Sequence, residues 1–197
     1  ARQYAMNLLA GGLYATKNYE DALSVMEAQL PMMRRLGDSA HNILALQSNL
    51  ANTYQGLRRL EQAMLLKGKV YSGYSKLYGE QHEHTLVAAD NYAMALLELR
   101  RFEEAKRLLR KVAPVTQRVL GNDHELTLSI RENLCLATLD GESPAEEKRD
   151  ALKMFEDTLG VMRRVLGPQH PDTQRGQRNL HSYNLEEARE KLASFDT

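Results

Sequence analysis

Two residue types recur along this 197-residue chain at a nearly constant interval. Glycines follow one another at steps of 42, 42 and 46 residues, at Gly37, Gly79, Gly121 and Gly167. The asparagines that keep the same three steps are Asn49, Asn91, Asn133 and Asn179. A fixed period of this length is typical of an array in which one supersecondary unit is repeated and each copy packs on its neighbours. We therefore expect a single repeat solenoid over residues 1–197.

The residues between these markers have the periodicity of α-helices. In the stretch 19–36, apolar residues stand at the steps of three and four that place them on one helical face: Leu23, Met26, Leu30 and Met33. Each unit is interpreted as two helices joined by a short turn, at 17–18, 58–59 and 100–101. This pattern predicts an all-α fold with repeats at about 1–37, 38–79, 80–121 and 122–167, then a terminal capping helix at 168–197.

The fourth unit is longer than the others because of an insertion between Leu139 and Ala151. Within it, Ser143 and Glu146 have the spacing of a capping box, with a proline at the first helical position. Four residues make about one helical turn. We expect the second helix of this unit to gain that turn at its N-terminus and to run over 144–166. Pro31 and Pro114 lie inside other helical stretches and predict kinks or tightened turns there.

Charge and cysteine content restrict the kinds of partner. Lys plus Arg and Asp plus Glu are equal at 26 each, so no net field attracts the chain to nucleic acid or to an anionic membrane. No apolar run approaches the length of a bilayer span. The single cysteine, Cys135, excludes an intramolecular disulfide framework and fits a reducing, cytoplasmic location. Because the sequence begins at Ala1 without an initiator methionine, we expect a piece of a longer or processed protein.

Two motifs repeat with the period. The asparagines begin the segments N-L-A-N-T-Y at 49–54, N-Y-A-M-A-L at 91–96 and N-L-C-L-A-T at 133–138, whose small third residue lets two helices approach closely. A linker L-G-x-x-H-x-x-T occurs at 120–127 and 166–173, and Gly79, His82 and Thr85 match it. The period alone also admits a HEAT or armadillo array. The linker together with the asparagine motif resembles the 42-residue tetratricopeptide repeat of kinesin light chains. The first unit departs from it, with Ala40 and Ile43 at the linker His and Thr positions.

This resemblance implies a right-handed tetratricopeptide solenoid of four helix pairs and a terminal helix, acting as a protein–protein interaction scaffold. In kinesin light chains the first helix of each pair lines the concave face, where the asparagine holds the backbone of an extended peptide. An asparagine carries both a donor and an acceptor, so it can bind a peptide's C=O and N–H without reading its sequence. The resemblance, together with neighbouring positions on the same helical face, gives these candidate partner-binding residues: Asn49, Asn52, Val87, Asp90, Asn91, Met94, Ser129, Glu132 and Asn133.

Two alternatives remain open. The asparagines could instead bond to adjacent helices and fix the stacking of the repeats, which would make the array a structural part of a larger assembly. The chain could also be an adapter region of a multidomain protein. Chaperone-tail binding is not expected, because Ser48 and Val87 stand where the carboxylate clamp of such tetratricopeptide domains has lysine.

No pattern of catalytic or cofactor-binding residues is found. A Gly-rich phosphate loop, a Ser/His/Asp arrangement and paired catalytic carboxylates are all missing from the sequence, so we expect neither an enzyme nor a cofactor. His82, His124 and His170 occupy one linker position a repeat apart, too far from one another to share a metal ion. Cys135 fills a small-residue position and is interpreted as a buried, inert thiol. The arginine pairs at 34–35, 58–59, 100–101 and 163–164 are all expected at helix C-termini, where they complement the helix dipole.

Overall fold

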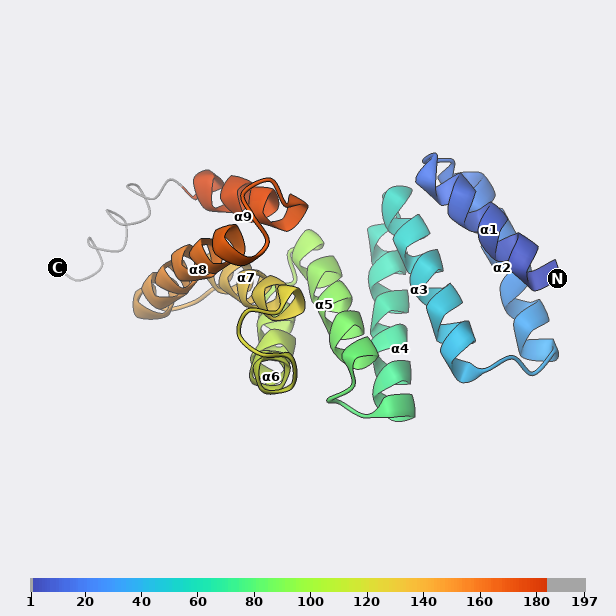
Figure 1. The fold of residues 1–197 in the computed structure, drawn as a ribbon, viewed down its shortest axis with the longest axis horizontal. Coiled ribbons are helices and arrows are strands. Elements are labelled where there is room, and N and C mark those ends of the chain that lie inside the picture. The colour runs from blue at the N-terminus through green and yellow to red at the C-terminus, as the bar shows by residue number, and fades with distance from the viewer. Residues whose placement is uncertain (1, 184–197) are drawn as a thin grey trace. The chain divides into compact units, whose positions relative to one another are not determined.

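The computed structural model describes residues 2–183, and every regular element within them is an α-helix (Figure 1). The helices are α1 (Arg2–Ala15), α2 (Tyr19–Arg35), α3 (Ala40–Gly56), α4 (Leu60–Tyr78), α5 (Glu83–Glu98), α6 (Phe102–Leu120), α7 (Glu125–Asp140), α8 (Ala145–Val165) and α9 (Pro171–Ser182). The predicted all-α class and the pairing of helices are confirmed. The terminal helix expected at 168–197 is present as α9, and its predicted continuation over 184–197 lies outside the described residues.

The chain divides into two compact units, Ala1–Leu99 and Arg100–Thr197, which are described separately. The boundary falls inside the predicted third repeat, between its first helix α5 and its second helix α6. The single continuous array expected from the period therefore stays a prediction.

The first unit contains α1 to α5, and each helix packs on the next one along the chain (Figure 1). Its larger core cluster consists of buried residues of α2 and α3: Ala22, Leu23, Met26, Met33, Leu46 and Leu50. Three of the four residues of the predicted apolar stripe on α2 are in this cluster, and Leu30 packs against it half-buried. A second cluster joins α3, α4 and α5 through Leu44, Val70, Tyr74 and Ala88. This second cluster lies under the candidate site.

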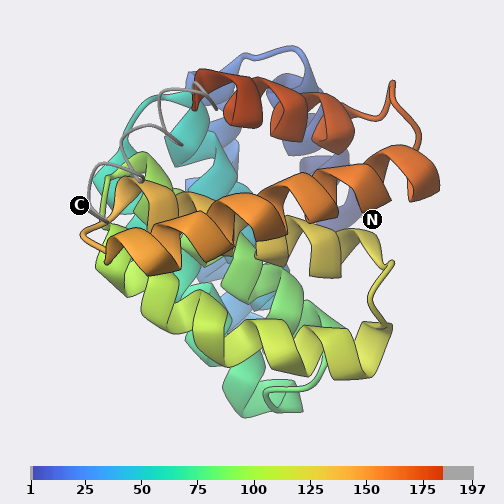
Figure 2. The same ribbon diagram turned by 90° about the vertical axis from the view of Figure 1, so that its left-hand side faces the viewer.

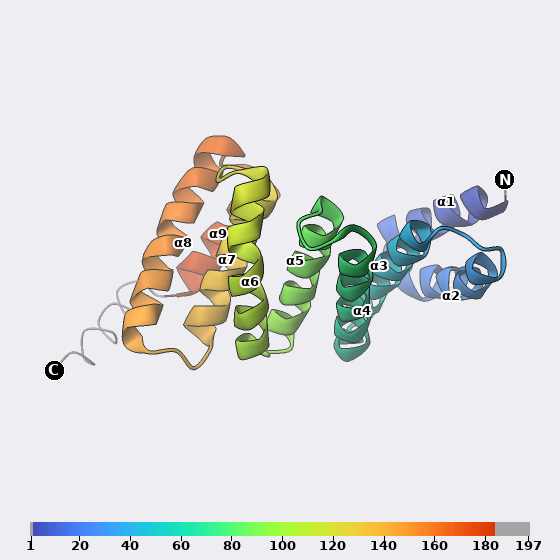
Figure 3. The same ribbon diagram turned by 90° about the horizontal axis from the view of Figure 1, so that it is seen from below.

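The second unit contains α6 to α9. Figure 3 shows α6, α7 and α8 side by side, and Figure 2 shows α8 in orange next to α9 in red. Leu128 of α7 packs with Leu159 and Met162 of α8. As predicted, the insertion lengthens α8 at its start: α8 has 21 residues, against 19 in both α4 and α6. Ala63 and Ala105 each stand three residues after the start of their helix, whereas Ala151 stands six residues after it.

The predicted capping box of α8 is wrong. The N-cap residue is Pro144, no side chain caps the helix, and the helix begins one residue later than expected. The Ser143 hydroxyl instead accepts a hydrogen bond of 2.8 Å from Nζ of Lys106, a buried lysine on α6. A tertiary partner therefore replaces the local cap.

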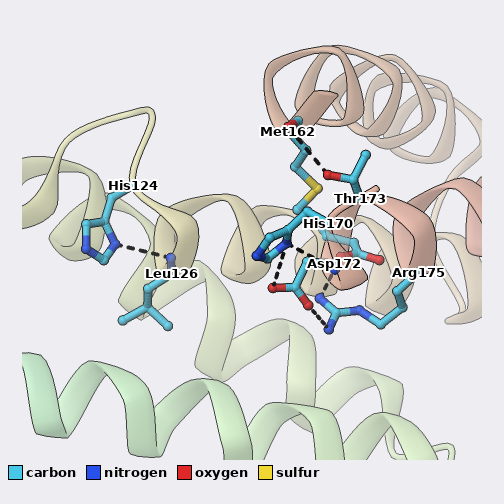
Figure 4. Close-up of polar contacts among 8 residues, drawn as sticks. His124, Leu126, Met162, His170, Asp172, Thr173 and Arg175 are labelled. Carbon is cyan, nitrogen blue, oxygen red and sulfur yellow. Dashed lines mark hydrogen bonds and ion pairs between the residues drawn. The ribbon is translucent and has the colours of Figure 1, made fainter. Parts of the chain in front are cut away.

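The linkers between repeats have one geometry. Gly79, Gly121 and Gly167 have φ angles of 88°, 92° and 92°, which residues other than glycine rarely adopt. The histidine that follows is the N-cap of the next helix, and its Nδ1 accepts the backbone N–H two residues on, as His124 does from Leu126 (Figure 4). Ser39 caps α3 in the first unit, where the linker histidine is missing. The linker motif is thus a helix stop followed by a cap.

The turns within pairs are where the sequence predicted them, and they correct one expectation. Lys17, Arg58 and Arg100 have positive φ angles of 60°, 60° and 57° between their two helices. Arg59 and Arg101 are N-caps, so these pairs do not lie at helix C-termini as expected, whereas the pairs at 34–35 and 163–164 do. Carboxylates offset their charge: Arg59 pairs with Glu20 at 3.1 Å and Arg101 with Glu104 at 2.5 Å. Pro31 and Pro114 lie inside α2 and α6, and both helices continue past them. The kinks or tightened turns expected at the two prolines stay a prediction.

Candidate functional site

A pocket of about 190 Å³ lies in the first unit, where α4 packs on both α3 and α5. Its lining comes from all three helices: Ala45, Ser48, Asn49, Val70, Tyr74, His84, Val87, Ala88 and Asn91. Three of the predicted partner-binding residues are among them, Asn49 on α3 and Val87 and Asn91 on α5. The structure therefore brings two asparagines that are 42 residues apart in sequence to one pocket.

The pocket combines an apolar wall with amide groups. Val70, Tyr74 and Ala88 are buried members of the core cluster below it. Val87 is 40% exposed and Asn49 is exposed, so part of the lining faces solvent. No Asp, Glu, Lys or Arg is among the lining residues. Such a lining suits an uncharged group, and the asparagine amides can both donate to it and accept from it.

A group of packed rings forms one side of the pocket, and the sequence did not predict it. Tyr74 and His84 line the pocket, and their ring centroids lie 5.5 Å apart. His41 of α3 contacts both, at 5.8 Å from Tyr74 and 4.9 Å from His84, and its Nδ1 is 3.2 Å from the Tyr78 hydroxyl. Burial, and then the neighbouring Tyr78, raise the pKa of Tyr74. The rings come from the ends of three helices, so only the helix packing brings them together.

The other predicted residues of the first unit lie outside the pocket lining. Asn52 and Met94 are half-buried. Asp90 is buried, with 7% of its surface exposed. Burial lowers the pKa of Lys67, and the negative charges of Glu98 and Asp90 partly oppose this effect.

Lys67 is an unusual core residue. It is only 5% exposed, and it stands four residues after Ala63, at the repeat position that Met26, Leu109 and Phe155 fill elsewhere. Its Nζ donates to Gln55 Oε1 at 2.5 Å, and Gln55 Nε2 donates to Glu98 Oε1 at 2.6 Å. A charged amine therefore replaces an apolar core side chain and is held by a short polar chain.

The predicted residues of the second unit are all buried. Ser129 and Asn133 have 8% and 3% of their surface exposed, and Glu132 has none. The Glu132 carboxylate accepts hydrogen bonds from Arg175 Nη2 at 2.9 Å and from Asn179 Nδ2 at 2.8 Å, both on α9. Arg175 also donates to Asp172 at 2.5 Å (Figure 4). Glu132 is thus held in a polar contact between first helices of successive repeats, and the sequence did not identify Arg175 as its partner.

Cys135 lies on the same helix as Glu132 and is fully buried. Burial raises the pKa of its thiol to about 12, an effect that the nearby Arg131 partly opposes. This agrees with the small-residue position predicted for it.

One group of potential metal ligands is found within residues 2–183. Glu125, His170 and Asp172 place ligand atoms within 4.8 Å of one another. The Nδ1 atom of His170 accepts the Asp172 backbone N–H at 3.3 Å, which leaves the proton of a neutral imidazole on Nε2 (Figure 4). The Asp172 carboxylate is bound by Arg175. The ligand atoms of His170 and Asp172 therefore already take part in a helix cap and an ion pair.

Comparisons with known proteins place these observations. The sequence profile of the tetratricopeptide repeat matches residues 43–84, 85–126 and 145–172, which is more than half of the chain. A search of curated proteins finds no match. Within residues 2–183 no helix is both long and apolar enough to cross a bilayer.

Solved structures share the fold at low sequence identity. Two of them are forms of a Podosopora anserina protein named for its kinesin light chain-like, nearly identical TPR-like repeats, with TM-scores of 0.75 and 0.73 at 20% and 21% identity. Each comparison covers 98% of this chain and 90% of the other. BtubC (BKLC) from P. vanneervenii has a TM-score of 0.74 at 19% identity, over 96% of this chain and 74% of its own. The chain belongs to the tetratricopeptide repeat family.

Proposed function

We propose that this chain is a protein–protein interaction scaffold that binds an extended peptide segment of a partner at the pocket formed by α3, α4 and α5. The observation that carries the proposal is that Asn49 and Asn91, from the first helices of two successive repeats, line one pocket. Two amides placed in this way offer two NH₂ groups as donors and two carbonyl oxygens as acceptors.

An extended peptide is the form of partner that such amides suit. Backbone N–H and C=O groups within a helix or sheet are already paired, whereas those of an extended segment need partners. The asparagines supply these partners without regard to sequence. The apolar wall formed by Val70, Val87 and Ala88 then selects among side chains.

The proposal divides the predicted residues between two roles. Ligand contact is assigned to Asn49, Val87 and Asn91, with Asn52 and Met94 flanking them on the same helices. Repeat stacking is assigned to the buried Asp90, Ser129, Glu132 and Asn133. The equal numbers of acidic and basic residues favour a protein partner over nucleic acid.

A second candidate function is a structural one, in which the array is a fixed part of a larger assembly. The contact of Glu132 with Arg175 and Asn179 favours it, because there the repeat positions that could bind a ligand are used for stacking. The two functions predict different results when the asparagines are changed.

The test uses the whole chain and two matched variants. Asn49→Ala combined with Asn91→Ala removes both pocket amides, and Asn122→Ala removes an amide from the exposed α6–α7 turn. Proteins captured from a native extract are compared, and circular dichroism checks the helicity of each variant. A partner that is lost only with the double variant, and whose binding segment is then mapped with overlapping peptides, supports the proposal. Capture of the same partners by all three forms contradicts it.

A further inference from the structure

The contact between successive first helices differs between the two units. Three repeat positions make this contact. The first is the residue just before the repeated asparagine of one repeat. The other two are the repeated asparagine of the next repeat and the residue four positions before that asparagine. In the second unit these residues are Glu132, Arg175 and Asn179, and they form a hydrogen-bonded ionic contact. In the first unit they are Ser48, Val87 and Asn91, and they line the pocket.

The difference follows from two side chains, because the third is an asparagine in both cases. Glu132 and Arg175 are long and oppositely charged, and Arg175 Nη2 lies 2.9 Å from the Glu132 carboxylate. Ser48 and Val87 are short and uncharged. The pocket of about 190 Å³ lies between them and Asn91.

We infer that residues 48 and 87 determine whether this junction is open, and that Ser48 and Val87 restrict the occupant to an uncharged, apolar side chain of the bound peptide. This inference rests on the proposed peptide-binding function and names the residue class that the peptide presents. An apolar side chain gains by displacing water from Val70, Val87 and Ala88. A lysine side chain would lose its hydration with no carboxylate among the lining residues, and a glutamate side chain would find no lysine or arginine there.

The direct test replaces the unknown peptide with single blocked amino acids. N-acetyl-leucine N-methylamide carries two peptide groups and one apolar side chain, and the lysine and glutamate derivatives differ from it only in the side chain. Each is titrated into the whole chain, and the NMR methyl signals of Val70, Val87 and Ala88 are followed. The leucine derivative is expected to shift these signals saturably, and the charged derivatives to bind at least tenfold more weakly. Equal binding of all three derivatives overturns the inference.

Variants test the two named positions. Ser48→Glu with Val87→Arg builds the ionic contact of the second unit into the first. This variant should bind the leucine derivative at least tenfold more weakly without a lower melting temperature. Ser24→Glu with Gln62→Arg adds the same charges at exposed positions of the first unit outside the pocket lining, and should leave binding unchanged. If the ionic variant does not fold, Val87→Phe fills the pocket from a partly exposed position and should have the same effect. Undiminished binding by a folded variant of either kind overturns the inference.

The experiments distinguish a failure of this inference from a failure of the proposed function. One outcome is that the leucine derivative binds the parent chain and not the ionic variant, while the double asparagine variant captures the same partners as the parent. In that case the pocket selects an apolar side chain as inferred, but the proposed function fails. If no derivative shifts the methyl signals while partner capture depends on Asn49 and Asn91, the inference fails and the proposed function remains.

Discussion

Arg175 Nη2 lies 2.9 Å from a carboxylate oxygen of Glu132, a residue with no exposed surface. Asn179 donates to the other carboxylate oxygen at 2.8 Å. The pair joins α7 to α9, the first helix of the fourth repeat to the helix that follows that repeat. A buried carboxylate requires such partners, because removal of one leaves a charge that neither water nor protein compensates.

Arg175→Ala is therefore expected to destabilise the protein by about 2 to 3 kcal/mol. This is below the 3–5 kcal/mol typical of a broken buried pair, because the Arg175 side chain is 30% exposed and water partly replaces its charge. Urea denaturation measures the loss. Glu132→Gln in the same chain removes the uncompensated charge and should restore at least half of the stability. Simple additivity of the two changes would contradict the assigned pairing.

Lys67→Met should stabilise the protein by about 1 to 2 kcal/mol at pH 7, because it replaces a buried amine with the side chain that Met26 contributes at the same repeat position. Burial lowers the pKa of Lys67 below its ordinary value of 10.5, so the folded state binds this proton less tightly than the unfolded state does. The stability of the unsubstituted protein relative to the variant therefore rises with pH between the lowered pKa and 10.5.

The measurement is a pair of thermal unfolding series from pH 7 to pH 10.5. The advantage of the Lys67→Met variant should be greatest at pH 7 and shrink toward pH 10.5. An advantage that grows with pH, or a variant less stable than the parent chain at pH 7, would contradict the account of Lys67.

Cys135 should react slowly with a thiol reagent such as Ellman's reagent at pH 8. With its pKa raised to about 12 against an ordinary value of 9.0, the thiolate fraction at this pH falls on the order of a thousandfold. Burial also blocks access to the sulfur. The control is the same chain in urea, where labelling should be complete within minutes. Equally fast labelling of the folded protein would show that α7 is not packed as described.

Two glycine-to-alanine changes should have opposite effects on the melting temperature. Gly121 has a φ of 92° and a ψ of 169°, a conformation nearly restricted to glycine, so Gly121→Ala should cost about 1 to 3 kcal/mol. Gly160 is an exposed residue inside α8, and a Cβ added there meets nothing within 4 Å. Gly160→Ala should stabilise the protein by about 0.5 to 1 kcal/mol. A loss of stability with Gly160→Ala would contradict the helical assignment at that position.

The repeat period predicted the helix pairs because each pair uses the same local signals. The linker glycine stops one helix, the linker histidine caps the next, and the apolar steps of three and four define the packed face. The lengthening of α8 at its start followed from a count of residues for the same reason. Local chemistry and helical geometry are sufficient for these features.

Choices between tertiary partners were not predictable in this way. Ser143 had the spacing of a cap, but Lys106 binds its hydroxyl from another helix. Glu132 occupies the same repeat position as Ser48, but Arg175 binds the Glu132 carboxylate whereas Ser48 lines a pocket. The rings of His41 and Tyr74 meet His84 only because three helix ends converge. Such outcomes depend on side chains that are distant in sequence, and no periodic signal marks them.

The measurement that tests the central claim most directly is the affinity of a mapped partner peptide for the whole chain and for Asn91→Ala, with the melting temperature of each recorded. Asn91→Ala should remove hydrogen bonds to the peptide backbone, with a loss of binding free energy of about 1 to 3 kcal/mol. This loss predicts binding weaker by roughly 5- to 150-fold at an unchanged melting temperature. Unchanged affinity with a lower melting temperature would show that Asn91 holds the repeats together and that the pocket is not the binding site.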